Sequence, residues 1–317
     1  MAIKAAQRLT GAHRSTPKLT FKRIWRYKYL YLMLVPVILN FILWHYIPMY
    51  GAQIAFRNFS PVRGITASNW VGLAHFRSFF GSIFFGQMLR NTLYLSIMSI
   101  IITWPLPILF ALLINEVPFR RYKRVMQTLS YLPFFVSVVV VAGITRMILS
   151  PESGIINDII RFFGGEGIHF LAIPEYFVWI YLGMLTWRWL GYDAIIYLAA
   201  ITSIDVEQYE AAHVDGASRL QRLWYITFPG LRMTIVILLI LRLGGIMNIQ
   251  WMEILLLQNS LNHSASEVIQ TFVFRRGLEM MDYSFATAAG LFQSVIGFIF
   301  ILGANKVSKK LSEISLF

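Results

Sequence analysis

The chain of 317 residues is 57% hydrophobic and only 14% charged, with a mean hydropathy of +0.61. Because a soluble domain carries about a quarter charged residues, this composition excludes an ordinary soluble globule and favours an integral membrane protein. The net charge of +13 lies in the ends and loops between apolar segments, so we expect no nucleic-acid partner. The absence of cysteine excludes disulfides and thiolate metal sites.

Six apolar segments are long enough to cross a bilayer, whose hydrocarbon core of about 30 Å needs roughly 20 helical residues. They are predicted at 29–50, 91–117, 125–149, 176–201, 231–257 and 284–305. Prolines such as Pro36 and Pro133 lie inside them, and a membrane bundle tolerates these because neighbouring groups satisfy the freed carbonyls. The predicted fold is all-α, with a basic tail (1–28), a six-helix membrane domain (29–305) and a short tail (306–317).

Lysine and arginine predict the orientation of these spans. They gather in the N-terminal tail, in the loop at 120–124, in the segment at 219–232 and near the C-terminus, whereas the intervening loops carry fewer. Loops rich in Lys and Arg stay in the cytoplasm. Both termini and the loop between the fourth and fifth spans are therefore predicted to be cytoplasmic.

The first outer loop, residues 51–88, is rich in aromatic side chains. Trp70, Phe76, Phe79 and Phe80 are expected at the level of the lipid headgroups, where aromatic rings concentrate. The loop is either an interfacial helix with an aromatic belt or a docking surface for an extracytoplasmic partner.

One polar stretch, YEAAHVDGASRLQRLWYITFPG, lies between the fourth and fifth spans. Just before it, Asp205 and Gln208 have the spacing of a helix capping box. Small residues between Ala211 and Ala217 keep the predicted helix thin, so that another protein can approach it closely. Pro229 is expected to end the segment before the fifth span. The residues alone leave two interpretations open: a surface helix at the membrane interface, or a helix that inserts into a groove of a partner.

The same stretch resembles the EAA loop of ABC importer permeases, whose pattern is E-A-A-x3-G-x9-I-x-L-P. The sequence matches every offset of this pattern and departs from it only at Phe228, which replaces leucine. The triplet DGA within it resembles the sugar-importing branch of these permeases. The residues that the resemblance assigns to coupling with an ATPase are Glu210, Ala211, Ala212, Asp215, Gly216, Ala217 and Pro229.

Further stretches, including IPMYGAQIAFRNF, YLPFFVSVVVV and EVIQTFVFRRG, resemble the LplB-type oligosaccharide permeases. The resemblance implies a type I ABC importer permease fold in a bacterial cytoplasmic (inner) membrane, with a coupling loop at about 203–230. It implies a heterodimer with a second homologous permease, two ATPase subunits and an extracytoplasmic solute-binding protein. ATP and Mg²⁺ would bind to the ATPase subunits and no cofactor to this chain. The implied substrates are complex oligosaccharides, including uronate-containing fragments of alginate or pectin.

Polar residues inside spans are candidates for a substrate path, because a charge at the bilayer centre is unfavourable by about 3 kcal/mol or more. Arg188 and Arg242 either form structural ion pairs, with Asp193 and Glu253 as possible partners, or line the path. Indole rings stack on sugars and Arg binds carboxylates in a bidentate fashion, which favours an acidic oligosaccharide. Arg146, near a span end, is expected to extend to the headgroups. The predicted path residues are Trp187, Arg188, Arg242, Asn248, Gln250 and Glu253.

Other classes of function lack their signals in the sequence. No G-x-x-x-x-G-K-[ST] loop occurs, so ATP hydrolysis is expected on another polypeptide, and the chain itself is not expected to be an enzyme. A secondary transporter or channel that works alone is the alternative, and it would need internal repeats and interrupted half-helices. Gly244 and Gly245 are one possible interruption, in the fifth span. An intramembrane enzyme would need a catalytic dyad or a metal cluster within the spans, and none stands out in the sequence.

Overall fold

The computed structural model describes Trp25 and residues 27–312. The predicted basic tail (1–28) therefore lies almost entirely outside the described residues, as does the end of the predicted C-terminal tail. The chain divides into two units, Met1–Gln53 and Ile54–Phe317, which are described one at a time.

The first unit contains the first predicted span. Its elements are α3 (Lys28–Phe41), the π-helical turn η1 (Ile42–Tyr46) and α4 (Ile47–Tyr50). Pro36 lies inside α3 without ending it. The helical stretch to which these elements belong is apolar and long enough to cross a membrane.

The second unit is helical apart from a small antiparallel ribbon, as far as its described residues go. Strand β1 (Arg57–Asn58) pairs with β2 (Asn69–Trp70), with Arg57 opposite Trp70. The Arg57 guanidinium closes the connecting loop by donating to the carbonyls of Thr66 (3.2 Å) and Ser68 (2.9 Å). The short helices at this end are η2 (Gly51–Phe56, which begins in the first unit), α5 (Gly64–Ala67) and α6 (Ala74–Phe80).

The remaining elements follow in chain order. They are α7 (Phe85–Thr103), α8 (Pro105–Asn115), α9 (Arg120–Tyr131), η3 (Leu132–Phe135), α10 (Val138–Ile148), α11 (Ile155–Phe162), η4 (Phe170–Ala172), α12 (Pro174–Thr202), α13 (Val206–Val214), α14 (Arg219–Arg222), η5 (Leu223–Thr227), α15 (Phe228–Gly244), α16 (Trp251–Leu257), α17 (His263–Ser266), α18 (Ile269–Phe274), η6 (Arg275–Glu279) and α19 (Tyr283–Ser312).

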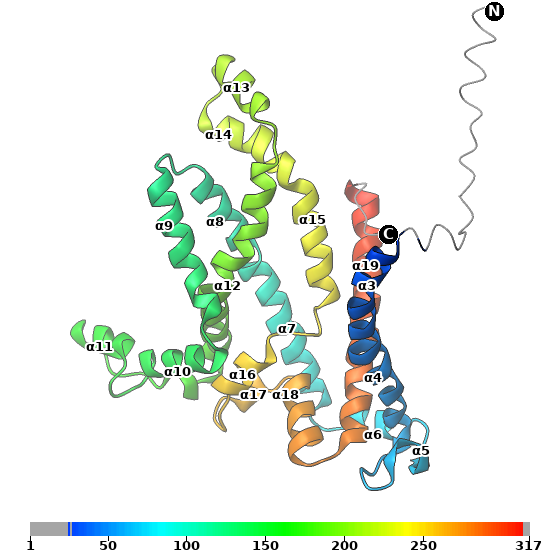
Figure 1. The fold of residues 1–317 in the computed structure, drawn as a ribbon. Helices are drawn as coiled ribbons and strands as arrows, with labels where there is room; N and C mark the ends of the chain where they lie inside the picture. Colours follow the sequence, from blue (N-terminus) through cyan, green and yellow to red (C-terminus); the bar gives the residue numbers. More distant parts are fainter. Residues whose placement is uncertain (1–24, 26, 313–317) are drawn as a thin grey trace, which may run out of the picture. The chain divides into compact units, whose positions relative to one another are not determined.

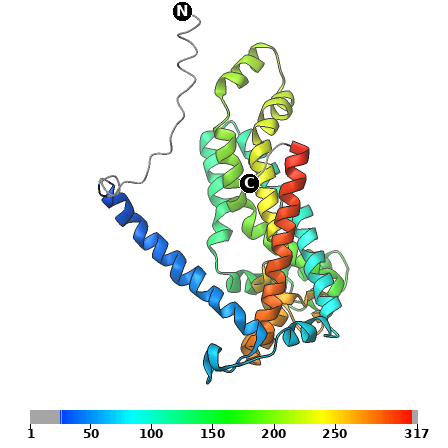
Figure 2. The same cartoon turned by 90° about the vertical axis from the view of Figure 1, so that its right-hand side faces the viewer.

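Helix α12 is the central helix of the second unit (Figures 1 and 2), and it packs against α7, α8, α9, α15 and α16. One apolar core surrounds its first half, where Phe177 and Leu182 are buried, and a second surrounds Ala194 and Leu198. Between the two cores, Gly191 permits close packing on α9, because a Cβ at this position would lie 2.2 Å from the carbonyl oxygen of Ser130. The two apolar cores along α12 thus hold the surrounding helices, and the polar residues that these helices carry, in fixed positions around it.

Among the described residues, four helices are long and apolar enough to cross a membrane, and the number is up to six if each of two bent pairs is counted as one span. The four are Lys28–Phe56, Phe85–Asn115, Arg219–Gly244 and Tyr283–Lys310. The bent pairs are Arg120–Phe135 with Val138–Ile148 and Pro174–Thr202 with Val206–Val214. These segments agree with the six predicted spans in number and order, but the third and the fifth differ from their predicted form.

The third span, predicted at 125–149, is bent rather than one continuous helix. The chain leaves helical geometry at Val136 and Ser137, and α10 then turns by 100° from the axis of α9 and η3. Pro133 lies just before this bend and supplies no backbone N–H to continue the helix. Span three therefore ends at one face of the bundle, and α10 runs across its axis.

The fifth span is not the helix predicted at 231–257. Its helix ends at Gly244, and a non-helical segment, 245–250, precedes α16. Side chains satisfy the freed carbonyls, since Ser96 Oγ donates to Ile246 (2.5 Å) and Gln293 Nε2 to Met247 (3.4 Å). At the start of the fifth span, one helix runs from Arg219 to Gly244 and passes through Pro229. The sequence had suggested that the coupling segment ends at this proline. Proline is tolerated there because it occupies the first turn of α15, directly after a π-helical turn.

The aromatic residues of the first outer loop do not all face the lipid headgroups. Phe79 is completely buried, with its ring 5.7 Å from that of Phe285 and 5.5 Å from that of Phe292. Trp70, in contrast, is exposed. The expectation for Phe79 was wrong because α6 packs against α19, a contact that composition alone does not reveal.

Candidate coupling segment and translocation path

The coupling segment, residues 203–230, forms two short helices joined by a tight turn. Asp205 caps α13 by accepting from the backbone N–H of Glu207 (3.0 Å). The complete capping box lies one helix later, where Ser218 and Gln221 bond reciprocally (2.7 and 3.3 Å) at the start of α14. Gly216 has a positive φ of 77°, a conformation that glycine adopts without strain. The turn that separates the two helices therefore depends on this glycine.

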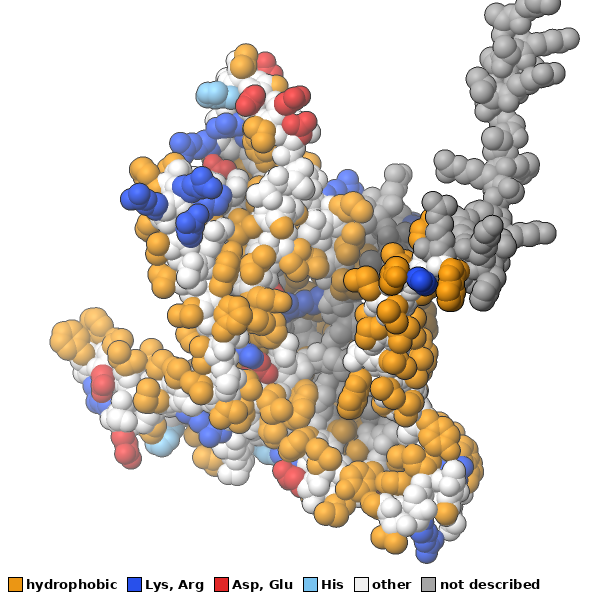
Figure 3. Space-filling view, in the orientation of Figure 1, with side chains coloured by type: hydrophobic (Ala, Val, Ile, Leu, Met, Phe, Trp, Pro, Cys, Tyr) orange, Lys and Arg blue, Asp and Glu red, His pale blue; other side chains and the backbone are white. Residues whose placement is uncertain are grey.

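The predicted coupling residues lie on a projecting tip of the second unit (Figure 1). The exposed ones are Glu210, Ala211, Asp215, Gly216 and Pro229, and the half-buried ones are Ala212 and Ala217. Acidic side chains gather over α13 in Figure 3, and the apolar Val214 is 86% exposed. A hydrogen bond of 2.9 Å between the hydroxyls of Tyr209 and Thr227 ties α13 to η5. The tip is thus ordered locally while most of its surface stays free for another molecule.

Both arginines predicted inside spans have carboxylate partners. Nη1 of Arg188 lies 2.5 Å from Oε1 of Glu253, and these side chains are 15% and 3% exposed. Nη1 of Arg242 lies 3.6 Å from Oδ2 of Asp193, while its Nη2 donates to the hydroxyl of Thr103 (2.8 Å). Pairing offsets part of the desolvation of each charge. The structural ion pairs considered from the sequence are present, with both of the partners named there.

A cavity of about 240 Å³ lies between α7, α12 and the break in the fifth span. Arg242, Asn248 and Gln250 line it, so three of the six predicted path residues meet at one place. Trp187 is half exposed on α12 and is not part of the lining, and neither Arg188 nor Glu253 reaches it. The other polar and aromatic lining residues are Ser96, Ser99, Thr103, Tyr181, Trp189 and Asp193.

Sequence reasoning missed most of this second group. Ser96, Ser99 and Thr103 recur at helical spacing, so a polar stripe along one face of an apolar span was the available signal. The buried indole N–H of Trp189 has no hydrogen-bond partner among the described residues. The cavity therefore offers cationic, hydroxyl, amide and aromatic groups, which is the chemistry that binds sugars. Among the described residues, no group of three or more His, Cys, Asp or Glu is placed to hold a metal ion.

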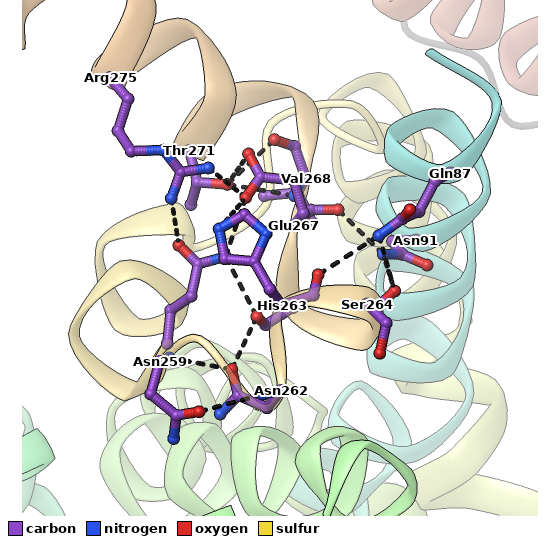
Figure 4. A network of polar contacts seen from close by, with 12 residues as sticks. Gln87, Asn91, Asn259, Asn262, His263, Ser264, Glu267, Val268, Thr271 and Arg275 are labelled. Atoms are coloured by element: carbon purple, nitrogen blue, oxygen red, sulfur yellow. Dashed lines mark hydrogen bonds and ion pairs between the residues drawn. The ribbon is translucent and has the colours of Figure 1, made fainter. Parts of the chain in front are cut away.

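A dense polar cluster lies at the opposite end of the second unit from the coupling segment (Figure 4). Its centre is Glu267, which is 3% exposed and forms an ion pair with Arg275. Nε2 of His263 lies 2.9 Å from the same carboxylate, and Asn91 of α7 donates to the backbone carbonyl of Glu267 (3.0 Å). We call this cluster the outer network; its residues are Gln87, Asn91, Gln258, Asn262, His263, Ser264, Ser266, Glu267, Thr271 and Arg275.

The outer network forms one wall of a larger cavity of about 1190 Å³. This cavity lies between the α6–α7 connection and the segment from α17 to η6. Arg276 and Asp282 form a second ion pair at its edge (3.0 Å). The end of the unit remote from the coupling segment thus has a mixed polar and apolar hollow with ion pairs along its wall.

Comparison with known proteins identifies the class to which this fold and these sites belong. The family model described as the inner membrane component of binding-protein-dependent transport systems matches residues 104–313. The chain belongs to this family, and it is a multi-pass permease subunit and not itself an enzyme.

Individual relatives match nearly the whole chain. The polygalacturonan/rhamnogalacturonan transport system permease protein YteP and Protein LplB, both of Bacillus subtilis, are each 42% identical over 92% of this chain, which is 90% and 92% of their own lengths. A permease chain of a bacterial ABC transporter that imports the acidic polysaccharide alginate is 40% identical, with a TM-score of 0.84 over 92% of this chain and 98% of that one. A second structure of an alginate ABC transporter, in complex with a periplasmic protein bound to an alginate pentasaccharide, gives 39% identity and a TM-score of 0.85, over 93% and 99%.

Proposed function

We propose that this chain forms the translocation path for a complex, uronate-containing oligosaccharide in an ABC importer. The observation that carries the proposal is the full-length similarity to permeases named or described for acidic polysaccharides, polygalacturonan and alginate among them. The cavity beside Arg242 supports it independently. At 3.6 Å from Asp193 the guanidinium is not held in a tight bidentate pair, so N–H donors remain for a substrate carboxylate.

The size of the cavity limits the contact to one sugar residue of the substrate at a time. Its volume of about 240 Å³ lies below the ~300–1,000 Å³ of ordinary small-molecule sites. Arg242, Asn248 and Gln250 contact the sugar in this proposal, and Tyr181 and Trp189 offer aromatic surface. Arg188 and Glu253 neutralise each other and join α12 to α16, so they position the walls of the path and do not touch the substrate. The outward Trp187 is left out of the path.

The coupling segment transmits the work of separate ATPase subunits. Residues Glu210 to Ala217 insert into a groove of an ATPase, and the turn at Gly216 keeps α13 at a fixed angle. ATP and Mg²⁺ bind to a pair of such subunits. A second, homologous permease completes the membrane part as a heterodimer. The exposure of α13 and its anchoring through Tyr209 support this assignment.

The outer cavity receives the solute-binding protein. It lies at the end of the unit remote from the coupling segment (Figure 1), which the distribution of Lys and Arg predicts to be extracytoplasmic. The ion pairs of the outer network around Glu267 keep this surface rigid. A rigid surface allows the partner to dock in a single orientation.

The proposal is tested with the complete importer reconstituted in liposomes. ATP-driven uptake is compared for an alginate or galacturonate tetrasaccharide and a neutral maltotetraose of the same length. We expect ATP-dependent uptake of an acidic tetrasaccharide and little of the neutral one. Uptake of the neutral sugar alone would contradict the acidic substrate, and uptake by this chain without ATPase subunits would instead establish the alternative, a transporter that works alone.

A further inference from the structure

Helices α10 and α11 form an arm that extends sideways from the bundle (Figure 1). The arm begins where α10 turns by 100° from α9 and η3, so it runs across the axis of the third span. Nη2 of Arg146 donates to the carbonyl of Leu256, which attaches α10 to α16. Arg146 thus attaches α10 to the bundle, and the arm has a fixed root there.

Helix α11 is amphipathic, and its apolar face is uncovered. Ile155, Ile159 and Phe162 recur at spacings of four and three, which places them on one side of the helix, and Phe163 follows directly after its last residue. Their exposed fractions are 59%, 50%, 83% and 81%. Two adjacent phenyl rings that are four-fifths exposed form an apolar patch that water solvates poorly. No described residue covers these rings.

The polar groups of the arm hold this face outward. Nδ2 of Asn157 donates to the carbonyls of Ser150 (2.9 Å) and Ile168 (3.1 Å), and its Oδ1 accepts from the N–H of Ile168 (2.7 Å). Arg161 donates to the carbonyls of Pro151 and Glu152, each at 2.9 Å. Both side chains thus bind the loops before and after α11 to the helix. Because these contacts fix the rotation of α11, the phenyl rings cannot turn inward.

We propose that the apolar face of α11 is embedded in the outer leaflet of the bilayer, at the boundary between headgroups and acyl chains. The face continues the exposed apolar surface of α10, where Val139, Val140 and Met147 are 60%, 51% and 63% exposed, as the apolar patch over the arm in Figure 3 shows. This surface begins at a membrane span, so lipid already meets it at the root. An amphipathic helix with aromatic rings on one face and charged residues on the other is the typical interfacial element.

The proposal depends on the chain being a multi-pass membrane protein and not on the identity of its substrate. The competing occupant is the second permease subunit, which would bury the same rings against protein. The two environments differ in a measurable way, since oxygen dissolves in lipid whereas a charged nickel chelate stays in water.

The chain has no cysteine, so a single introduced thiol is unique in this subunit. Phe163→Cys and, as the matched control on the same arm, the exposed Glu166→Cys are spin-labelled in the complete transporter in liposomes, with other subunits free of reactive thiols. Both positions are exposed, and retained ATP-driven uptake verifies that the labelled proteins fold.

We expect the label at 163 to collide at least threefold more often with oxygen than with the nickel chelate, and the label at 166 to show the reverse. Reaction of the thiol at 166 with an impermeant maleimide added outside right-side-out vesicles assigns the leaflet. An immobile label at 163 that collides with neither reagent would mean that protein covers α11. Equal access of the nickel chelate to both positions would mean that water, and not lipid, surrounds the apolar face of α11. Either result overturns the proposal, as would labelling of position 166 only from the cytoplasmic side.

Discussion

The two ends of the second unit are built in opposite ways. The coupling segment has few tertiary contacts, no buried residue in α13 and one hydrogen bond, between Tyr209 and Thr227, that ties α13 to η5. The outer network buries Glu267 among four donor side chains and joins α7 to α17 and α18 (Figure 4). The difference teaches that contacts within this chain stabilise the outer end, whereas the tip has few such contacts and, in our proposal, is completed by an ATPase. Substitutions should therefore affect stability at the outer end and coupling at the tip.

The largest expected effect comes from removing the centre of the outer network. Glu267→Ala leaves Arg275 without its carboxylate in a largely buried site, which should destabilise the protein by about 3 kcal/mol. The measurement is the thermal unfolding midpoint in detergent. His263→Ala is the matched control, since His263 is 42% exposed and should change the midpoint much less. Equal midpoints for Glu267→Ala and the unaltered protein would show that the network does not stabilise the protein.

The ion pair between Arg188 and Glu253 lies between the two ends that are compared, and it tests whether a buried pair inside the spans also serves stability. Glu253→Ala should destabilise by roughly 2–3 kcal/mol, because it leaves a buried guanidinium unpaired, and Arg188→Met together with Glu253→Met should recover most of that loss. A double-mutant cycle on thermal stability measures the coupling. Any variant that folds, including Arg188→Ala, should keep its KM for the acidic oligosaccharide. A raised KM would return Arg188 to the substrate path.

At the tip, Gly216→Val should impair coupling more than stability. A β-branched residue at φ 77° is unfavourable by about 1–2 kcal/mol, and this strain should reorient α13 and lower ATP-driven uptake about tenfold. Gly216→Asn is the control, because asparagine tolerates this conformation. The readouts are uptake and recovery of the ATPase with the permease. If the asparagine variant is impaired as strongly as the valine variant, coupling requires the absence of a side chain at position 216 and does not depend on its φ.

The smallest expected effect is on substrate affinity. Arg242→Gln removes the cation of the 240 Å³ cavity and should raise the KM for an acidic oligosaccharide about fivefold, which corresponds to roughly 1 kcal/mol. The double variant, Arg242→Gln with Asp193→Asn, also removes the carboxylate that Arg242→Gln leaves unpaired. It therefore separates the effect of losing the cation from the effect of an unpaired anion in the cavity. An unchanged KM in both variants would exclude Arg242 from the substrate contact.

Much of the fold could be predicted from the chain alone. Apolar length and the distribution of Lys and Arg are properties of consecutive residues, so six spans and a polar loop between the fourth and fifth were recognisable. The capping pattern at Asp205 predicted a short helix in the coupling segment for the same reason, although the structure has two, α13 and α14. Local pattern also named the carboxylate partners of both arginines inside spans, though it could not choose between pairing and a substrate path.

Other features depended on contacts between distant residues. Gly244 and Gly245 marked a possible break in the fifth span, but the break is stable because Ser96, Gln270 and Gln293, which lie on other elements, satisfy the carbonyls of Ile246 and Met247.

Phe79 is buried because α6 packs on α19, and the bend after Pro133 directs α10 onto α16. Hydropathy reports how apolar a residue is, but not whether lipid or protein surrounds it. In a chain this apolar only the packing of the helices decides that, and with it the position of the cavity, the outer network and the arm.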